Sequence, residues 1–313
     1  MDTTYGYVTF VMGNGHYLNG AKVLATSLMK TNSKFPIILF VTPDVVIDAE
    51  CLMLFDEIIT INYITHKCKN LMTDSMDRIY GSWIEKSFTK LNVFNEKWYS
   101  RRMEKIIYLD ADQIVLENLD HLFNLPTPAM SFDSEYSDMY FIQGINNPFK
   151  HLTSGDIVPY KMLRDNFYKN IVAASGTMII SPNQMFFDRA IAILKSYDEY
   201  GHKIYNGFDE QLIAETLIDL KINSTHISKL YCWNAGQYQA LRSGMAYVIN
   251  YYGRSKPWLS PKIKYFDEFI WEYFFHLKRE YTDSHLTRRD ERQMMVREIF
   301  SRERKTFHKQ SSV

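Results

Sequence analysis

Strand-like and helix-like segments alternate from the start of the chain, and this order limits the possible folds more than any other feature. Residues 5–12 are rich in β-branched and aromatic side chains, residues 17–30 carry apolar side chains at helical spacing, and residues 36–42 have the composition of a fully buried strand. The same order continues in three further segments, a strand at 58–61, a helix at 83–98 and a strand at 106–109. Such alternation predicts an α/β fold with a mostly parallel, doubly wound sheet.

The second half of the chain has similar segments on either side of a polar stretch. We expect a strand over 175–180 and helices over 184–197 and 208–220. Residues 133–172 are polar and contain glycines, asparagines and prolines, which predicts a lid or a disordered excursion. Beyond residue 258 the chain becomes basic, and we expect a helical extension with a mobile tail.

The charge balance and the cysteine content argue against several classes of protein. Lys plus Arg equals Asp plus Glu at 36 each in 313 residues, so no overall field favours nucleic acid or an anionic membrane. The three cysteines are widely spaced and show no disulfide or zinc-binding pattern. No apolar stretch approaches the roughly 20 residues of a transmembrane helix, and the amino terminus lacks the pattern of a secretory signal. We therefore expect a cytoplasmic protein without a nucleic-acid partner.

Asp110 and Asp112 carry the main chemical signal of the sequence. They follow the buried-type run 106–109 and are separated by one small residue, Ala111. Two carboxylates at the end of a strand repel one another unless a cation lies between them, and such hard oxygen ligands suit Mg²⁺ or Mn²⁺. A turn after the strand is the alternative, since aspartate is common in turns. The pattern alone leaves both interpretations open.

The loop Gly13-Asn14-Gly15 ends the first predicted strand, just as the two aspartates end a later one. Parallel α/β sheets bind their ligands at the carboxyl ends of the strands. We therefore expect a nucleotide and a metal ion at one edge of one sheet. The loop lacks the full Gly-x-Gly-x-x-Gly spacing, which argues against a dinucleotide-dependent oxidoreductase.

Four segments form a recognisable pattern when they are taken in order. They are the opening strand and loop at 7–21; Lys90-Leu91 with 108–112 and 118–123; Ser175-Gly176 with 208–212; and 250–258, which reads Asn-Tyr-Tyr-Gly-Arg-Ser-Lys-Pro-Trp. Together they resemble the family 8 retaining glycosyltransferases, which include glycogenin and galactinol synthase and whose last motif reads His-x-x-Gly-x-x-Lys-Pro-Trp. The resemblance spans residues 5–258, about four-fifths of the chain.

This resemblance implies a fold, a domain division and a reaction. The implied fold is the GT-A glycosyltransferase fold over residues 1–258, with a donor- and metal-binding half at 1–125 and an acceptor half at 126–258. A helical extension would occupy residues 259–313. The implied donor is a UDP-sugar, the implied cofactor is Mn²⁺ with Mg²⁺ as the alternative, and the sugar would be transferred with retention at the anomeric carbon.

The resemblance also implies roles for single residues. Three residues would hold the metal ion: Asp110, Asp112 and Asn250. Three would serve catalysis: Asp209, Lys90 and Lys256, the last by holding a phosphate oxygen as UDP leaves. The expected donor-binding residues, some of which share those roles, are Thr9, Val11, Asn14, Tyr17, Asp110, Ala111, Asp112, Asp133, Ser175, Gly176, Glu210, Gly253 and Lys256.

Three positions depart from the family pattern. Asn250 stands where the family has a histidine ligand, and because an amide oxygen is a hard but neutral ligand, we expect weaker metal binding or a shift towards Mg²⁺. Ala174 replaces an asparagine before Ser-Gly. Glu210 replaces a glutamine and adds a charge beside Asp209.

The leading interpretation is a retaining hexosyltransferase that uses UDP-glucose or UDP-galactose. Its acceptor would be a hydroxyl group of a polyol such as myo-inositol, of a glycan or of a protein. Glycogenin-like self-glucosylation remains one alternative. A catalytically weakened UDP-sugar-binding module, suggested by Asn250, remains another. The sequence leaves open whether the chain forms a homodimer.

Overall fold

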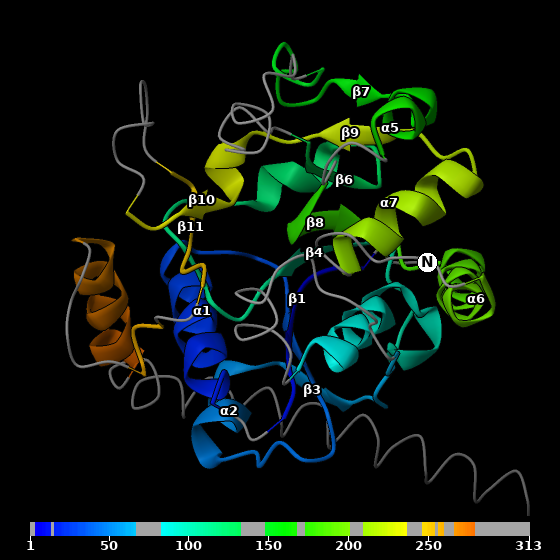
Figure 1. The fold of residues 1–313 in the computed structure, drawn as a ribbon. Helices are drawn as coiled ribbons and strands as arrows, with labels where there is room; N and C mark the ends of the chain where they lie inside the picture. The colour runs from blue at the N-terminus through cyan, green and yellow to red at the C-terminus, as the bar shows by residue number, and fades with distance from the viewer. Residues whose placement is uncertain are drawn as a thin grey trace, which may run out of the picture.

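The computed structural model of the protein describes residues 4–13, 16–66, 83–132, 148–167, 173–200, 209–236, 246–253, 256–259 and 266–278. These residues form a three-layer α/β structure with helices on both faces of a central sheet (Figure 1). A smaller sheet and the helix over 266–278 lie beside it.

The central sheet has eight strands in the order β3-β2-β1-β4-β8-β6-β9-β7. The strands are β1 (Tyr5–Val11), β2 (Ile37–Val41), β3 (Glu57–Thr60), β4 (Lys105–Leu109), β6 (Ala129–Ser131), β7 (Ile157–Val158), β8 (Ala174–Ile180) and β9 (Ser224–His226). β3, β2, β1 and β4 are parallel to one another, whereas β8 runs antiparallel to both β4 and β6. The predicted parallel, doubly wound half is therefore confirmed, and an antiparallel strand follows it.

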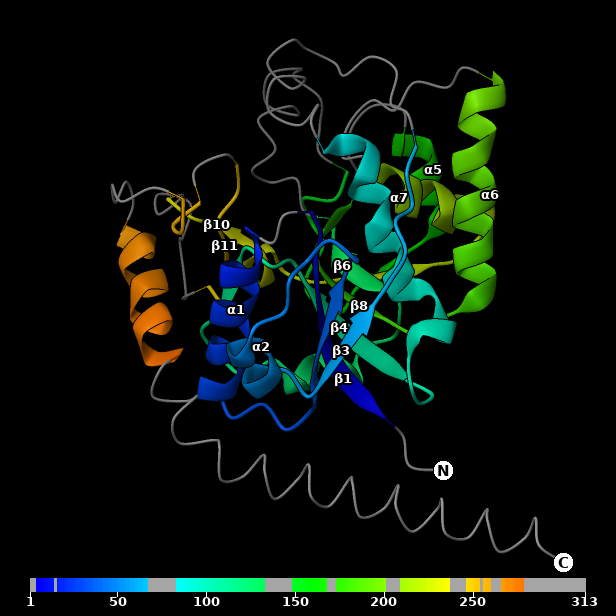
Figure 2. The same ribbon diagram turned by 90° about the horizontal axis from the view of Figure 1, so that it is seen from below.

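Strands β1, β2, β4 and β8 are buried on both faces because two hydrophobic clusters enclose them. One cluster places Leu39 and Ile107 against helix α1 (Leu18–Lys30). The other places Phe40 and Tyr108 against the 3-10 helix η1 (Ile84–Phe94) and helix α7 (Asp209–Asp219). The period-two alternation of a strand sends successive side chains to these opposite faces. Figures 1 and 2 show α1 and α2 on one side of the sheet and α6 and α7 on the other.

The helical elements include the predicted helices and several shorter ones that were not predicted. They are α1 (Leu18–Lys30), α2 (Ala49–Leu54), η1 (Ile84–Phe94), η2 (Glu96–Trp98), η3 (Asp120–Asn124), α5 (Tyr160–Phe167), α6 (Gln184–Tyr200), α7 (Asp209–Asp219) and η4 (Lys229–Tyr231), where η marks a 3-10 helix.

A three-stranded sheet completes the structure next to α1. It consists of β10 (Trp233–Asn234), β11 (Val248–Asn250) and β5 (Gln113–Val115), with β5 antiparallel to β11. The helix over 266–278 packs on it through Trp271 and Phe274, which share a cluster with Val23 of α1. In both ribbon views this helix lies beside α1 (Figures 1 and 2). The predicted helical extension after residue 258 is confirmed over these residues.

The predicted helical segment over 83–98 is confirmed, and its turns are 3-10 turns. One prediction about local structure needs correction. The polar stretch 133–172 was expected to be irregular, yet residues 148–167 contain β7 and α5. β7 forms because it adds to the sheet edge beside β9, and α5 buries Leu163 against the core. The remaining parts of that stretch, 133–147 and 168–172, lie outside the described residues.

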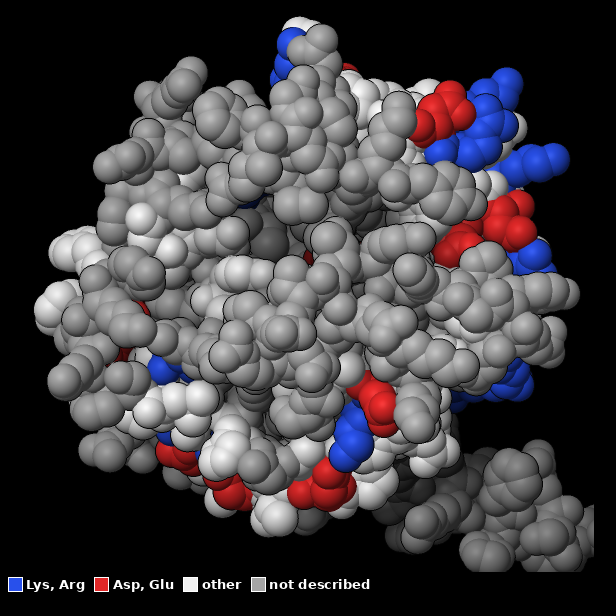
Figure 3. Space-filling view, viewed as in Figure 1, with Lys and Arg blue, Asp and Glu red and all other residues white. Residues whose placement is uncertain are grey.

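The surface agrees with the balanced composition. On the face shown in Figure 3, acidic and basic side chains of the described residues occur next to one another around the rim. Among the helices in the described ranges, none has the length and apolar character needed to cross a bilayer.

Candidate active site

Asp110 is the first residue beyond β4 and lies at the carboxyl end of that strand. Tyr108 lies two residues earlier, and its hydroxyl donates a hydrogen bond of 2.7 Å to Asp110 Oδ1. The backbone N–H of Asp110 donates to the carbonyl oxygen of Gly176 at the start of β8, at 2.9 Å. The antiparallel neighbour strand therefore fixes the position of this carboxylate.

Lys90 of η1 joins Asp110 to the beginning of α7. Its Nζ lies 3.0 Å from Asp110 Oδ1 and 3.0 Å from Asp209 Oδ2. The same ammonium donates to Ser175 Oγ at 3.0 Å, and Ser175 Oγ donates to Asp209 Oδ2 at 2.7 Å. Although burial opposes it, the carboxylates of Asp110 and Asp209 hold the pKa of Lys90 well above its usual value. Four predicted site residues thus form one hydrogen-bonded cluster.

Glu210 adds a further carboxyl group to this cluster. Its Oε1 accepts a hydrogen bond of 3.0 Å from the backbone N–H of Ser175. Burial, with the adjacent charge of Asp209 as the next cause, raises the pKa of Glu210 to about 7. Burial likewise raises the pKa of Asp110 to about 6, and Lys90 opposes that rise. Burial is the main cause of both shifts, and neighbouring carboxylates raise both pKa values further.

Asp112, at the other end of the Asp-Ala-Asp turn, is paired with Lys256. The buried ammonium of Lys256 contacts Asp112 Oδ2, donates to the carbonyl oxygen of Tyr251 at 2.7 Å and lies 5.4 Å from the ring centroid of Tyr17. Burial raises the pKa of the Tyr17 hydroxyl. Trp258 packs edge-on against Tyr17, with ring centroids 5.4 Å apart. The final motif of the sequence is therefore folded against the turn that carries the two aspartates.

Asn250 reaches the same region through the small sheet. β11 pairs Asn250 with Gln113, the residue that follows Asp112, and the N–H of Tyr251 donates to the carbonyl oxygen of Asp112 at 2.9 Å. The side-chain amide of Asn250 donates to Asn234 Oδ1 at 3.2 Å. Its own Oδ1 is buried and has no hydrogen-bond partner among the described residues. A buried oxygen in that state needs a donor or a cation.

These residues fit a divalent cation. Four carboxyl groups, from Asp110, Asp112, Asp209 and Glu210, surround two ammonium groups, which leaves a formal excess of two negative charges. The unpartnered amide oxygen of Asn250 adds a neutral hard ligand. In the described part of the chain, no group of three His, Cys, Asp or Glu side chains is arranged as a metal site. Asn250 as the third protein ligand stays a prediction, which its unpartnered amide oxygen supports.

The remaining predicted donor-binding residues lie at nearby strand ends or outside the described residues. Thr9 and Val11 are buried in β1, the parallel neighbour of β4, and Thr9 Oγ1 has no partner among the described residues. Ala111 is buried against α1, where a Cβ at Gly20 would lie 2.3 Å from its carbonyl oxygen. Gly253 has φ +86°, a conformation that favours glycine. Asn14 and Asp133 lie outside the described residues.

Four residues of the site were not predicted from the sequence: Tyr108, Gln113, Asn234 and Cys232. Tyr108 could have been found, since strand alternation places it on the same side as Asp110. Gln113 Nε2 donates to Cys232 Sγ at 3.3 Å, and burial raises the pKa of this thiol to about 12. No local pattern indicates Asn234 or Cys232, because tertiary packing brings them to the site.

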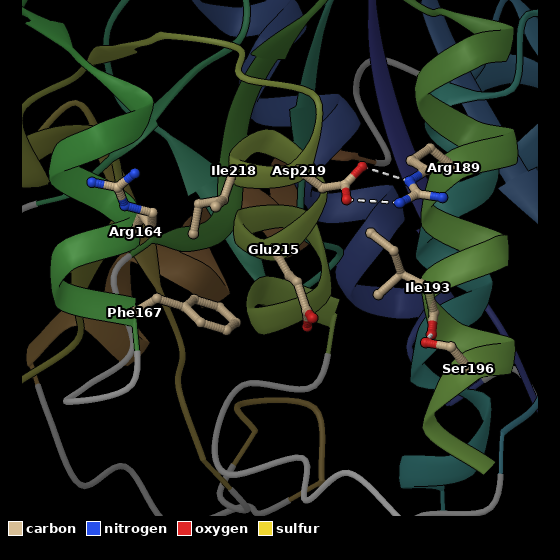
Figure 4. A pocket seen from close by; sticks show the side chains of 8 residues that line it. All are labelled: Arg164, Phe167, Arg189, Ile193, Ser196, Glu215, Ile218 and Asp219. Atoms are coloured by element: carbon tan, nitrogen blue, oxygen red, sulfur yellow. Dashed lines mark hydrogen bonds and ion pairs between the residues drawn. The ribbon is translucent and has the colours of Figure 1, made fainter. Parts of the chain in front are cut away.

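A separate hollow of about 280 Å³ lies between α5, α6 and α7 (Figure 4). It is lined by Arg164, Phe167, Arg189, Ile193, Ser196, Glu215, Ile218 and Asp219. Both arginines are paired with carboxylates: Arg189 with Asp219 at 2.5 and 2.7 Å, and Arg164 with Asp165 at 3.0 and 2.9 Å. The hollow lies towards the carboxyl end of α7, whereas the candidate active site uses its amino end.

Sequence comparison finds relatives that match part of the chain, while no family model matches it. Galactinol synthase 1 of Solanum lycopersicum is 35% identical over 120 residues, and galactinol synthase 3 of Arabidopsis thaliana is 38% identical over 120 residues; each match covers 38% of this chain. An uncharacterized protein, R707, of Acanthamoeba polyphaga mimivirus is 29% identical over 184 residues, 58% of this chain. The matches cover 36%, 34% and 57% of those three relatives.

Comparison with solved structures extends over most of the chain. The galactosyltransferase LgtC, in complex with donor and acceptor sugar analogs, matches with a TM-score of 0.56 and 13% identity over 86% of this chain and 95% of LgtC. The glycosyltransferase GlyE of Streptococcus pneumoniae TIGR4 matches with a TM-score of 0.54 and 14% identity over 90% of this chain and 64% of GlyE. The chain therefore has the expected GT-A glycosyltransferase fold, and over 38% of its length its sequence is similar to galactinol synthases.

Proposed function

We propose that the protein is a metal-dependent retaining glycosyltransferase that moves a hexose from a UDP-sugar to a hydroxyl acceptor. The observation that carries the proposal is the convergence of Asp110, Asp112, Lys256, Lys90 and Asp209 at the carboxyl end of β4. These residues come from four separate segments of the sequence, and the GT-A fold brings them to the edge where such sheets bind ligands.

Each part of the site has a distinct role in this proposal. A divalent cation held by Asp110, Asp112 and Asn250 would supply Lewis-acid neutralisation of the leaving diphosphate. Lys256 would bind a phosphate oxygen, because its buried ammonium lies beside Asp112.

Ser175, Asp209 and Glu210 would orient the donor sugar. The Ser175 hydroxyl and the two carboxyl groups are close enough to bond to one another, so their oxygen atoms point into a common region. Converging acceptors of this kind bind vicinal hydroxyl groups. Lys90 holds Asp209 and Asp110 at fixed separations and limits their mutual repulsion.

The proposed transfer needs no reactant other than the UDP-sugar and the acceptor. The bond between the anomeric carbon and the diphosphate oxygen breaks, and the electron pair leaves with UDP. The acceptor oxygen forms its bond to the anomeric carbon on the same face, and the acceptor proton passes to the departing diphosphate. The protein contributes orientation and electrostatic stabilisation of the developing charge.

The acceptor and the hexose belong to the same proposal. Partial sequence similarity to galactinol synthases favours UDP-galactose as donor and a polyol such as myo-inositol as acceptor. A glycan, or a hydroxyl group of the protein itself, would use the same chemistry. The acceptor experiment below separates these cases.

A second candidate is a UDP-sugar-binding module with weakened catalysis. Asn250 favours it, because a neutral amide at a metal-ligand position binds a cation less strongly than imidazole or carboxylate does. This candidate predicts UDP binding without release of UDP from a UDP-sugar.

The test is a panel of UDP-glucose and UDP-galactose with Mn²⁺, Mg²⁺ or EDTA. Each reaction contains myo-inositol, an oligosaccharide or no acceptor, and released UDP is measured. We expect metal-dependent UDP release that an acceptor accelerates, and a product whose anomeric configuration equals that of the donor by NMR. An increase in the intact protein mass by one hexosyl residue, without added acceptor, would indicate self-glycosylation.

Two results would contradict the proposal. Binding of UDP without turnover under every condition would favour the binding module. Turnover that is equal in EDTA and in Mn²⁺ would remove the assigned role of the metal ligands.

A further inference from the structure

The contacts of Lys256 suggest more than a phosphate-binding role. Its side chain is 5% exposed, and the structure pairs it with Asp112, a residue that the proposed function assigns to the metal ion. The same carboxylate is thus a partner for a lysine ammonium and a ligand candidate for a divalent cation. Two cations that share one carboxylate repel each other, so one weakens the binding of the other.

We propose that Lys256 is an internal counter-cation of Asp112 that makes cation binding depend on nucleoside diphosphate binding. A divalent cation alone competes with the Lys256 ammonium for Asp112. A diphosphate removes the competition, because it gives the ammonium a new anionic partner. This inference rests on the proposed function and adds an order to its binding steps.

The surroundings of Lys256 explain why it needs such a partner. Among the described residues, its other contacts are the carbonyl oxygen of Tyr251 and the ring of Tyr17, and neither carries a full charge. When a buried ammonium loses its carboxylate partner, its charge is left uncompensated, and this costs the folded protein free energy. Lys256 therefore resists cation binding at Asp112 until an anion arrives.

Lys90 provides an internal contrast at the same site. It also contacts a metal-ligand candidate, Asp110, at 3.0 Å. Lys90 also contacts Asp209 at 3.0 Å and Ser175 at 3.0 Å. It therefore keeps a carboxylate partner when Asp110 binds a divalent cation. Coupling to the diphosphate is consequently a property of Lys256 and not of every lysine in the site.

The coupling has a measurable size and is reciprocal. Linked binding sites commonly change each other's affinity about 5- to 150-fold, and the factor is the same in both directions. We expect UDP to raise the Mn²⁺ affinity of the native protein by a factor in this range. Removal of the Lys256 charge should make Mn²⁺ alone bind about 10-fold tighter, and the UDP-induced factor should fall by a similar amount.

The experiment is a Mn²⁺ titration of the full chain, with free Mn²⁺ followed by electron paramagnetic resonance in the presence and absence of UDP. The variants are Lys256→Met and Lys256→Gln, the second of which keeps a donor for the Tyr251 carbonyl if the first folds poorly. Thermal unfolding gives a second readout: Mn²⁺ alone should raise the Tm of the variants more than it raises the Tm of the native protein.

Lys22 offers a matched control outside the site. It lies in α1 and is buried like Lys256. It pairs with two carboxylates at the start of α2, those of Asp48 and Glu50. Lys22→Met should lower the Tm, because it removes the cation of Asp48 and leaves Glu50 with Lys278 alone, while Mn²⁺ affinity and the UDP factor stay native. Lys90→Met should alter Mn²⁺ affinity but keep the UDP factor.

The possible results separate this inference from the proposed function. If the native protein binds Mn²⁺ and UDP cooperatively but Lys256→Met leaves the affinity for Mn²⁺ alone unchanged or weaker, the counter-cation role is wrong and the proposed function stands. If the native protein binds no Mn²⁺ with UDP present, the metal part of the proposed function and this inference both fail.

Discussion

The buried charges of the candidate site are arranged so that carboxylates outnumber ammonium groups. Lys90 serves Asp110 and Asp209, Lys256 serves Asp112, and Glu210 relies on a backbone N–H. Removal of one group therefore changes the balance of the whole cluster, and the direction of the change depends on the sign of the charge removed.

Asp110→Asn tests the cation role at the level of one residue. The substitution keeps the size of the side chain but removes a charged ligand, so stabilisation of the leaving diphosphate should fall. We expect UDP release to slow at least ~100-fold, equivalent to about 2.7 kcal/mol of barrier. Asp165→Asn, on the exposed surface of α5, is the control and should be neutral. Near-native turnover of Asp110→Asn with metal present would refute the role.

His226 predicts how stability depends on pH. Its Nδ1 accepts a hydrogen bond from the N–H of Phe132 at 3.2 Å, and burial lowers the pKa of this imidazole from 6.5 to about 4. In the unfolded chain, His226 is protonated below about pH 6.5, whereas in the folded chain it is protonated only below about pH 4. The contribution of His226 to stability should therefore fall as the pH drops through this interval, by about 1.4 kcal/mol per pH unit.

The measurement is urea unfolding at a series of pH values for the native protein and for His226→Asn. The asparagine oxygen can accept the same hydrogen bond but does not titrate, so the acid-side slope should be shallower for the variant. Equal slopes for both proteins would show that His226 does not contribute to this pH dependence.

At the scale of the elements, Gly20 allows helix α1 to approach the Asp-Ala-Asp turn closely. A Cβ at Gly20 would lie 2.3 Å from the carbonyl oxygen of Ala111 and 2.8 Å from Trp258. Alanine is the better helix former by about 1 kcal/mol, but overpacking typically costs about 1–3 kcal/mol. Because a contact of 2.3 Å forces the backbone to move, we expect the overpacking cost to exceed the gain in helix propensity.

Gly20→Ala should therefore lower the free energy of unfolding by about 1–2 kcal/mol and weaken Mn²⁺ binding in the presence of UDP. Urea unfolding and the Mn²⁺ titration measure the two effects. Asn19→Ala changes the exposed neighbouring residue in the same helical turn and should leave both quantities unchanged. If the glycine variant matches this control, the turn does not depend on close approach of α1.

Local patterns predicted the elements that follow simple periodicity. β1, α1, β2, β4, β8, α6 and α7 occur where they were expected, because long apolar periodic segments determine their own type. The short β7 and the small α5 were missed, since polar composition hides elements that pairing at a sheet edge stabilises. The antiparallel insertion of β8 beside β4 was also missed, because strand order depends on contacts between distant segments.

In the candidate site too, the sequence predicted the residues that lie in motifs and missed those that only tertiary contacts bring together. Asp110, Asp112, Lys90, Ser175, Asp209 and Lys256 were identified from motifs, and the structure brings them together. The ion pair between Lys256 and Asp112 joins residues 144 positions apart, and no sequence window contains both. The partner of Asn250, Asn234, was missed for the same reason.

At the scale of the whole molecule, the helix over 266–278 packs against the small sheet that carries part of the candidate site. Trp271 is 4% exposed; its ring lies 5.8 Å from Trp258 and stacks on Phe275 at 5.1 Å. It belongs to the cluster beneath β5 and β11, the strands that position Asp112 and Asn250. The helix thus couples global stability to the geometry of the metal-ligand candidates.

Trp271→Ala should cost about 3–5 kcal/mol of stability, the usual range for removal of a buried tryptophan, and should weaken Mn²⁺ binding as well. Thermal unfolding and the Mn²⁺ titration are the measurements. Phe266→Ala, at a position 68% exposed on the same helix, is the control and should be close to native. Equal behaviour of the two variants would mean that the helix does not stabilise the small sheet.

The pairing of β5 with β11 has a consequence for when activity can begin during synthesis. β5 leaves the ribosome soon after the two aspartates, whereas β11 and Lys256 emerge more than a hundred residues later. A nascent chain that has folded its parallel strands still lacks the amide oxygen and the ammonium that complete the pocket. Incomplete translation products should consequently consume no nucleotide sugar, however native their amino-terminal half becomes.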